Sequence, residues 1–187
     1  MNKKIKKELQ KDKKEKVNYN WIIKIIITAF IIAFVFSTAS ELILPKVNLF
    51  VGILIVLLFI FLGVIFDMIG VAVTAADEAP FHAMASRKIN GAKIAVKLKK
   101  NADKVSTFCN DVVGDICGII SGAGGAVISV NISESLNLNS FIVAIIITSI
   151  ISALTIGGKA VEKSYAINKS NEILYNASKV LSIFIKR

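Results

Sequence analysis

The chain has 187 residues, a hydrophobic share of 55%, a mean hydropathy of +0.68 and a formal net charge of +10. This is far more apolar sequence than the core of a soluble domain of this size requires, so we expect an all-α integral membrane protein. The two cysteines, Cys109 and Cys117, have a spacing that fits no zinc pattern and supports no disulfide scaffold. We expect them to act as small packing residues.

Residues 1–20 form a basic segment that contains the run "NKKIKKELQKDKKEK". Two interpretations remain open for it. It is either a cytoplasmic anchor that sets the topology, or a tail that binds particular lipids or a partner. The apolar run that follows is too long for a cleavable signal peptide.

Four apolar segments are long enough, or nearly so, to cross a hydrocarbon layer of roughly 30 Å as helices. We expect spans at about residues 21–44, 49–76, 110–131 and 139–158, within a transmembrane domain of residues 21–158. In the third span glycines recur every four residues, at Gly114, Gly118 and Gly122. This spacing favours close helix packing. The pair Gly124-Gly125 predicts a loosened or broken helix near the middle of the membrane.

Between the second and third spans, residues 77–107 are rich in charge and predict a juxtamembrane helical hairpin. Pro80 suits a first helical turn, and Asn90-Gly91 favours a turn between two helices. One helix face then carries a basic stripe, formed by Lys93, Lys97, Lys100 and Lys104. Ile94 and Leu98 mark another face, so we expect an amphipathic hairpin at the inner membrane surface. Periodicity leaves open whether it anchors the protein or plugs a transport path.

Basic residues concentrate in residues 1–16, 77–107 and 159–187, whereas the two other loops hold only Lys46. Because Lys and Arg are retained on the cytoplasmic side, we predict that both termini are cytoplasmic, in a bacterial-type plasma membrane. Residues 159–187 then form a cytoplasmic amphipathic helix. Topology and attraction to anionic membrane lipids explain the net charge, so nucleic acid is not an expected partner.

Carboxylates at membrane depth are the most informative polar groups, since each costs at least a few kcal/mol in hydrocarbon. They are Asp67, Asp111 and Asp115. Asp111 and Asp115 share one helix face, where two like charges repel unless they share a proton or a cation. A hard divalent cation would suit them. Neutral oxygen donors that would complete such a metal site are Thr74, Asn110 and Ser121. For Asp111 an interfacial helix start is an equal alternative, and for the glycines simple packing is one.

The order of segments from about residue 49 to 158 resembles the transmembrane domain of the CorC/CNNM (cyclin M) magnesium transporter family. The stretches that carry the resemblance are "TAADEA", "PFHAMASRKINGAKIAVKLKKNADKVST" and "NDVVGDI". In that family the first span ends in a Ser-Glu-Thr-Ala-like signature, and an Asn-Pro-Asp-Arg-like turn precedes the next span. Glu78 and Ala79 correspond to the signature here, although Asp77 and Ala79 replace its serine and threonine. Residues 101–104 correspond to the turn.

The resemblance implies magnesium binding by hydroxyl, amide and backbone oxygens between these spans, and hence roles for Thr74 and residues 110–115. We therefore predict a reduced family member that binds or transports Mg2+ or a related divalent cation. We expect it to be a homodimer packed through its small-residue faces, without an organic cofactor. It has an additional N-terminal span, and the CBS domains that usually follow in the family are not expected.

A function of a different class stays open, namely a non-transporting membrane scaffold or accessory subunit that recruits a partner or anionic lipid. It would use the basic hairpin and the apolar residues of the C-terminal segment, which are Val161, Tyr165, Ile173, Val180 and Phe184. An enzyme is not expected, because one histidine and two distant cysteines provide no nucleophile and base at a recognisable spacing.

Overall fold

The structure is a computed structural model that describes residues 19–184, and over this range it consists of helices without a strand. Within these residues four helical segments are long and apolar enough to cross a membrane. They are Tyr19–Lys46, Leu49–Ala75, Ala102–Leu136 and Ser140–Asn168. The predicted all-α membrane fold with four spans is therefore confirmed. The basic tail predicted for residues 1–20 lies outside the described residues, apart from its last two.

The first two spans are joined by a tight turn. Helix α2 (Tyr19–Ile43) runs into a short 3-10 helix, η1 (Leu44–Lys46), whose proline stands in its first turn. Helix α3 (Leu49–Ala75) then begins after Asn48, whose side chain accepts a hydrogen bond from the backbone N–H of Val51 at 2.9 Å. Such a cap satisfies a donor that the first turn of a helix leaves unpaired.

The third span is a composite helix. It starts as α6 (Ala102–Ser106), continues as a π-helical segment, η2 (Thr107–Gly114), and ends as α7 (Asp115–Leu136). The fourth span is α8 (Ser140–Asn168), which Asn139 caps through a hydrogen bond from the backbone N–H of Phe141. The predicted break at Gly124-Gly125 is wrong, because α7 is continuous there and the irregular segment lies earlier, in η2.

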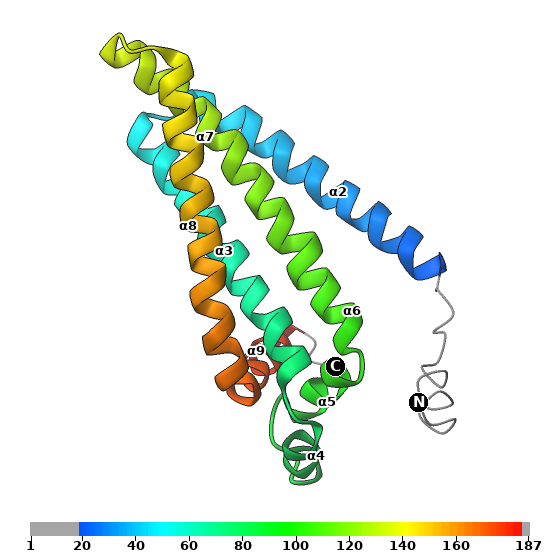
Figure 1. The fold of residues 1–187 in the computed structure, drawn as a ribbon. Coiled ribbons are helices and arrows are strands. Elements are labelled where there is room, and N and C mark those ends of the chain that lie inside the picture. The colour runs from blue at the N-terminus through cyan, green and yellow to red at the C-terminus, as the bar shows by residue number, and fades with distance from the viewer. Residues whose placement is uncertain (1–18, 185–187) are drawn as a thin grey trace, which may run out of the picture.

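Helices α3, α7 and α8 form the centre of the bundle, with α3 and α8 running in one direction and α7 in the other (Figure 1). A core of Val56, Ile60, Ile128 and Ile151 joins them. Helix α2 lies along the outside. None of the residues in the most apolar 18-residue stretch of the first span is buried. In the third span, 56% of the residues in the corresponding stretch are buried. The third span is thus the most buried of the four.

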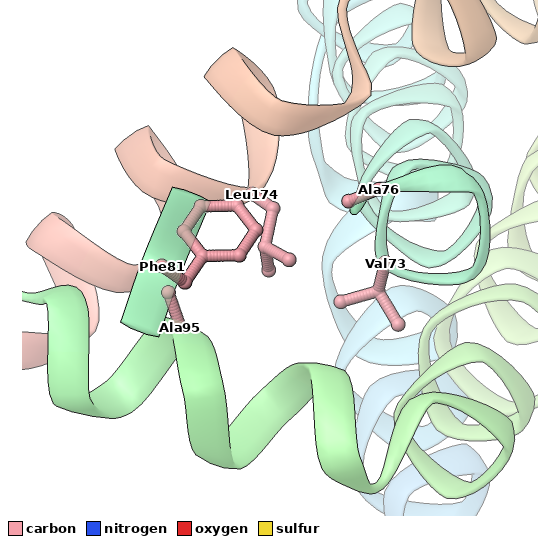
Figure 2. Packing of buried hydrophobic residues seen from close by; sticks show 5 residues of the cluster. All are labelled: Val73, Ala76, Phe81, Ala95 and Leu174. Carbon is pink, nitrogen blue, oxygen red and sulfur yellow. The ribbon is translucent and has the colours of Figure 1, made fainter. Parts of the chain in front are cut away.

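Three short helices gather at one end of the bundle (Figure 1), and we call them the cap: α4 (Glu78–Ser86), α5 (Ala92–Lys100) and α9 (Ser170–Phe184). Their shared core consists of Val73, Ala76, Phe81, Ala95 and Leu174. Figure 2 shows the Phe81 ring beside Leu174, with Ala76 pointing toward them from the end of α3. Phe81 is only 1% exposed, so the cap packs onto the bundle as part of the same fold.

The predicted hairpin is present as α4 and α5, and Gly91 supplies its turn with a φ of +83°. A side chain at Gly91 would also lie 3.1 Å from the Cα of Lys179 in α9, so the turn needs glycine for space as well. The apolar face of α5, including Ala95 and Leu98, packs on α9 and on the end of α3. That face is therefore covered by protein instead of resting on the membrane surface.

Polar contacts attach the cap to the end of α3. The Lys99 ammonium donates to the backbone carbonyls of Thr74 at 2.9 Å and Val73 at 3.3 Å. The last carbonyls of a helix lack partners within the helix, and a cation there also suits the helix dipole. On the other side, the backbone N–H of Asp77 donates to Oδ1 of Asn171 in α9 at 2.8 Å. Both contacts fix the point where α3 turns into the cap.

Helix α8 extends to Asn168, ten residues beyond the predicted end of the fourth span at residue 158. The predicted amphipathic helix of residues 159–187 is therefore divided between the end of α8 and α9, with a break at Lys169. The sequence changes from apolar to charged at Gly157-Gly158, which predicts a helix end there. The helix instead continues, and the first charged residue after the glycines, Lys159, pairs with Asp67 on α3 and Asp115 on α7.

The glycines of α7 act differently from the prediction. No atom of the described residues lies within 4 Å of where a Cβ would stand on Gly118 or Gly122, so these two face open space. Close packing occurs at Gly124, whose Cβ would lie 2.6 Å from Cγ2 of Val56. Gly118 and Gly122 therefore lie on a different face of α7 from Gly124, whereas Gly114, the first glycine of the stripe, belongs to η2 and is closely surrounded.

We predict that Gly124→Ala lowers the melting temperature of the purified protein in detergent. Its methyl group would collide with Val56, whose β-branched side chain has little rotamer freedom, at a cost of roughly 1–3 kcal/mol. Gly157→Ala on α8 is the matched control, because no neighbouring atom of the described residues lies within 4 Å of a Cβ there. It adds the same methyl group to open space and gains up to about 1 kcal/mol of helix propensity, so its melting temperature should stay level or rise. Equal melting temperatures of the two variants would contradict the close packing of Gly124 against Val56.

Candidate cation site within the helix bundle

Four charged side chains from the three central helices lie at one level of the bundle. Asp67 stands eight residues, or about 12 Å, before the end of α3. Lys159 and Glu162 stand at a comparable distance from the end of α8, which runs in the same direction. Asp115 is the first residue of α7, which runs in the opposite direction. We call these four residues the charged cluster.

One ammonium group connects two carboxylates in this cluster. Nζ of Lys159 lies 3.4 Å from Oδ1 of Asp67 and 3.5 Å from Oδ1 of Asp115. The Asp67 side chain is 15% exposed, the Lys159 side chain 28% and the Asp115 side chain 65%. The ion pair with Asp67 is therefore the more protected, and Asp115 lies at the open edge of the cluster.

Glu162 is the most unusual member of the charged cluster. The residue is 6% exposed, and neither carboxyl oxygen has a hydrogen-bond donor within the described residues, although the Asp67 carboxyl group lies within hydrogen-bonding reach. The charged groups around it are Asp67 on α3 and Lys159 and Lys163 on α8 itself. An ionised carboxylate buried without a donor costs several kcal/mol. The carboxyl group of Glu162 is therefore stable only if it carries a proton or contacts a water molecule or a cation.

The backbone next to the cluster is built to leave room for it. Gly114 is the last residue of η2, and a Cβ there would lie 3.6 Å from both Oδ1 of Asp67 and Nζ of Lys159. It would also lie 3.3 Å from the carbonyl oxygen of Cys109. A larger residue would thus press on the ion pair. The neighbouring π-helical turn is a rare feature that recurs at functional sites.

Two of the six residues predicted for a metal site, Asp67 and Asp115, are brought together, through Lys159. Asp111 is exposed, and within the described residues it forms no ion pair. Asn110 is partly buried. Its amide donates to Oγ of Ser106 at 3.4 Å, while its Oδ1 is buried without a partner beside Gly70.

The other two predicted residues make hydrogen bonds within their own helices. Oγ1 of Thr74 donates to the carbonyl of Val71 at 2.8 Å, and Oγ of Ser121 donates to the carbonyl of Cys117 at 2.7 Å. Among the described residues, no group of three His, Cys, Asp or Glu side chains is arranged to hold a metal ion. Instead, two carboxylates of the cluster, those of Asp67 and Asp115, contact the ammonium group of Lys159.

Lys159 and Glu162 were not predicted from the sequence, although a signal for them exists. Polar residues follow one face of α8 at intervals of four and three, namely Thr148, Ser152, Thr155, Lys159 and Glu162. This spacing is helical and continues past Gly157-Gly158. Toward the other end of α8 the same face borders a groove of about 210 Å³, which Gly118 and Gly122 line from α7.

Glu78, the residue that corresponds to the family signature, lies in the cap and not in the charged cluster. Its carboxylate is 2.8 Å from Nε2 of His82, one turn along α4. This hydrogen bond lowers the pKa of Glu78. Both side chains are about half exposed, so the pair is a surface contact of the cap.

Comparisons with family models, curated proteins and solved structures gave no match to this chain. The charged cluster is therefore interpreted from its own chemistry. It brings three carboxyl groups and one ammonium group together within helices that are long and apolar enough to cross a membrane, where such groups are rare.

We predict that Glu162→Gln raises the free energy of unfolding by about 1–3 kcal/mol, measured by thermal or chemical unfolding in detergent. The amide keeps the shape of the side chain, removes an unpaired charge and can donate to Asp67. Glu172→Gln serves as the control. It removes the same charge from an exposed ion pair with Lys169, and a change within about 0.5 kcal/mol is expected. A loss of stability in Glu162→Gln would show that its carboxylate already has a stabilising partner.

Proposed function

We propose that this chain is a reduced, CorC/CNNM-like membrane protein that binds or transports Mg2+ or a related divalent cation at the charged cluster. The observation that carries the proposal is Glu162, a buried carboxyl group without a hydrogen-bond donor, beside Asp67 and Lys159. Carboxylate oxygens are the ligands that hard divalent cations prefer. The span, hairpin and span order that resembles the family supports the same conclusion.

The charge of the two paired carboxylates favours a divalent over a monovalent cation. Asp67 and Asp115 contribute two negative charges to the position that the Lys159 ammonium holds. Electrostatic interactions are stronger in the poorly polarisable interior of a helix bundle than in water. A doubly charged ion in place of the ammonium would therefore neutralise both carboxylates.

The proposal places the cap and both termini on the cytoplasmic side of a bacterial-type plasma membrane. The exposed lysines of α5, Lys93, Lys97 and Lys100, support this orientation because positive residues are retained on that side. It also includes a homodimer. Gly118 and Gly122 offer an open small-residue face on α7, of the kind that membrane helices use for close approach.

We predict that Asp115→Asn weakens Mg2+ binding to the full chain in lipid nanodiscs by at least about tenfold, measured by isothermal titration calorimetry. Asp67→Asn should act in the same direction, because each substitution removes a carboxylate of the cluster. Magnesium flux into vesicles should fall in parallel.

Asp111→Asn is the matched control, since it removes the same charge four residues away without touching the cluster. We expect its Mg2+ affinity to equal that of the wild type. Equal affinity of wild type and Asp115→Asn, or an equal loss in Asp111→Asn, would reject this site.

A second candidate function, a membrane scaffold, is favoured by apolar residues that stand exposed near the cap. They are Val161 and Tyr165 at the end of α8 and Val180 and Phe184 on α9, with Phe184 81% exposed. Ile173, the fifth residue predicted for this face, is partly buried. An exposed apolar surface beside a membrane suits a lipid surface or a partner protein.

Co-purification from native membranes distinguishes the two functions. If the chain is a scaffold, a stoichiometric partner should be recovered with the wild type and lost with Phe184→Asp, which places a charge on the exposed face. Lys179→Asp is the control, because Lys179 is also exposed on α9 but is not one of the exposed apolar residues. The partner should still be recovered with it. Recovery of a homodimer with a response to Mg2+ and no partner favours the transporter.

A further inference from the structure

The ammonium group of Lys159 lies where a cation bound by the cluster would lie. It reaches from α8 to Asp67 on α3 and Asp115 on α7, at 3.4 and 3.5 Å. A mobile cation held by the same two carboxylates would stand next to this ammonium and be repelled by it. Lysine and a mobile cation therefore cannot both occupy this position.

The contacts of Lys159 are those of a group that can be released. Both distances exceed the 2.7–2.9 Å that is typical of strong hydrogen bonds between ammonium and carboxylate. Within the described residues, the ammonium makes no other hydrogen bond or ion pair. A lysine head is compact and strongly hydrated, and it is carried on a flexible stem. The side chain is 28% exposed, so protein does not enclose it fully.

Lys159 leaves the cluster incompletely neutralised. Glu162, three residues further along α8, stays buried and without a hydrogen-bond donor even though the ammonium is present. This carboxyl group is more than nine-tenths buried and lies next to two carboxylates that are paired with Lys159. The cluster therefore holds one more possible cation ligand than the lysine contacts. The acidic groups are not arranged around one metal position here, which is expected while an ammonium stands between Asp67 and Asp115.

We propose that Lys159 is a tethered cation that competes with the mobile divalent cation for Asp67 and Asp115 and leaves them when that cation binds. This inference rests on the proposed function, and it adds a residue that sets affinity and release. With the lysine in place, the cluster stays partly neutralised between binding events. With the lysine displaced, Glu162 supplies a third carboxylate for the incoming ion.

The test compares Mg2+ binding of the full chain in nanodiscs for the wild type, Lys159→Met and Lys169→Met, by titration with magnesium chloride. Removing the competitor should tighten binding by about tenfold or more, because the cluster is then free in every molecule. Lys169→Met removes the same charge at the end of α8, where Lys169 is exposed and pairs with Glu172 instead of a residue of the cluster. Its affinity should stay within about twofold of the wild type.

A second measurement uses the wild type alone and so does not depend on whether Lys159→Met folds. Amine acetylation followed by peptide mass spectrometry should show Lys159 reacting several-fold faster when Mg2+ is present, with Lys169 unchanged. Slower or unchanged labelling of Lys159 with Mg2+ would overturn the proposal, and so would equal or weaker binding in Lys159→Met.

The outcomes separate this inference from the proposed function. If Asp67→Asn abolishes binding while Lys159→Met binds no tighter than the wild type, the cation site stands and the tethered lysine is rejected. If neither the wild type nor Lys159→Met binds Mg2+, both ideas fail. Binding that appears only in Lys159→Met and is lost when Asp67→Asn is added supports competition by the lysine and rejects the proposed function of the wild type.

Discussion

The arrangement of the central helices depends on one requirement, that charges at membrane depth find partners. Lys159 meets it for carboxylates on two other helices, so α3, α7 and α8 must approach closely at its level. Small residues make this approach possible. Gly63 lies one turn before Asp67, and a Cβ there would stand 3.1 Å from Cβ of Cys117. Gly158 lies next to Lys159, and its Cβ would stand 2.9 Å from Cγ2 of Val64. Close helix packing and ion pairing are therefore parts of one constraint.

The same constraint connects the charged cluster to the cap. Helix α8 carries Lys159 and Glu162 and continues without interruption to Asn168, directly before α9. Helix α9 contributes Leu174 to the core shared with Phe81 and the end of α3 (Figure 2). Asp67 and the anchoring point of the cap thus belong to α3, and Lys159 belongs to the helix that leads into the cap. A shift of α8 relative to α3 would change the ion pair and the cap packing together.

Hydropathy alone predicted the four spans, because a hydrocarbon layer leaves few alternatives to long apolar helices. It also placed Asp67 at membrane depth. Its partner Lys159 was not predicted, since the pair is 92 residues apart in sequence and depends on how α3 packs beside α8. The sequence also did not show which glycines of α7 pack against a neighbouring helix. Gly122 and Gly124 are two residues apart, but Gly124 faces Val56 and Leu44 whereas Gly122 faces open space. Local pattern gives the helices, whereas tertiary packing decides which polar residues meet.

The choice of lysine in the cluster has a physical consequence that other basic residues would not share. An arginine would present a planar fork that holds carboxylates with two parallel hydrogen bonds, and it never loses its charge. Such a group stabilises a permanent link between helices. The lysine head touches Asp67 and Asp115 at single atoms, at distances beyond those of strong charged hydrogen bonds. The link among α3, α7 and α8 therefore lacks the bidentate geometry of a permanent one, as the proposed exchange of Lys159 for a mobile cation requires.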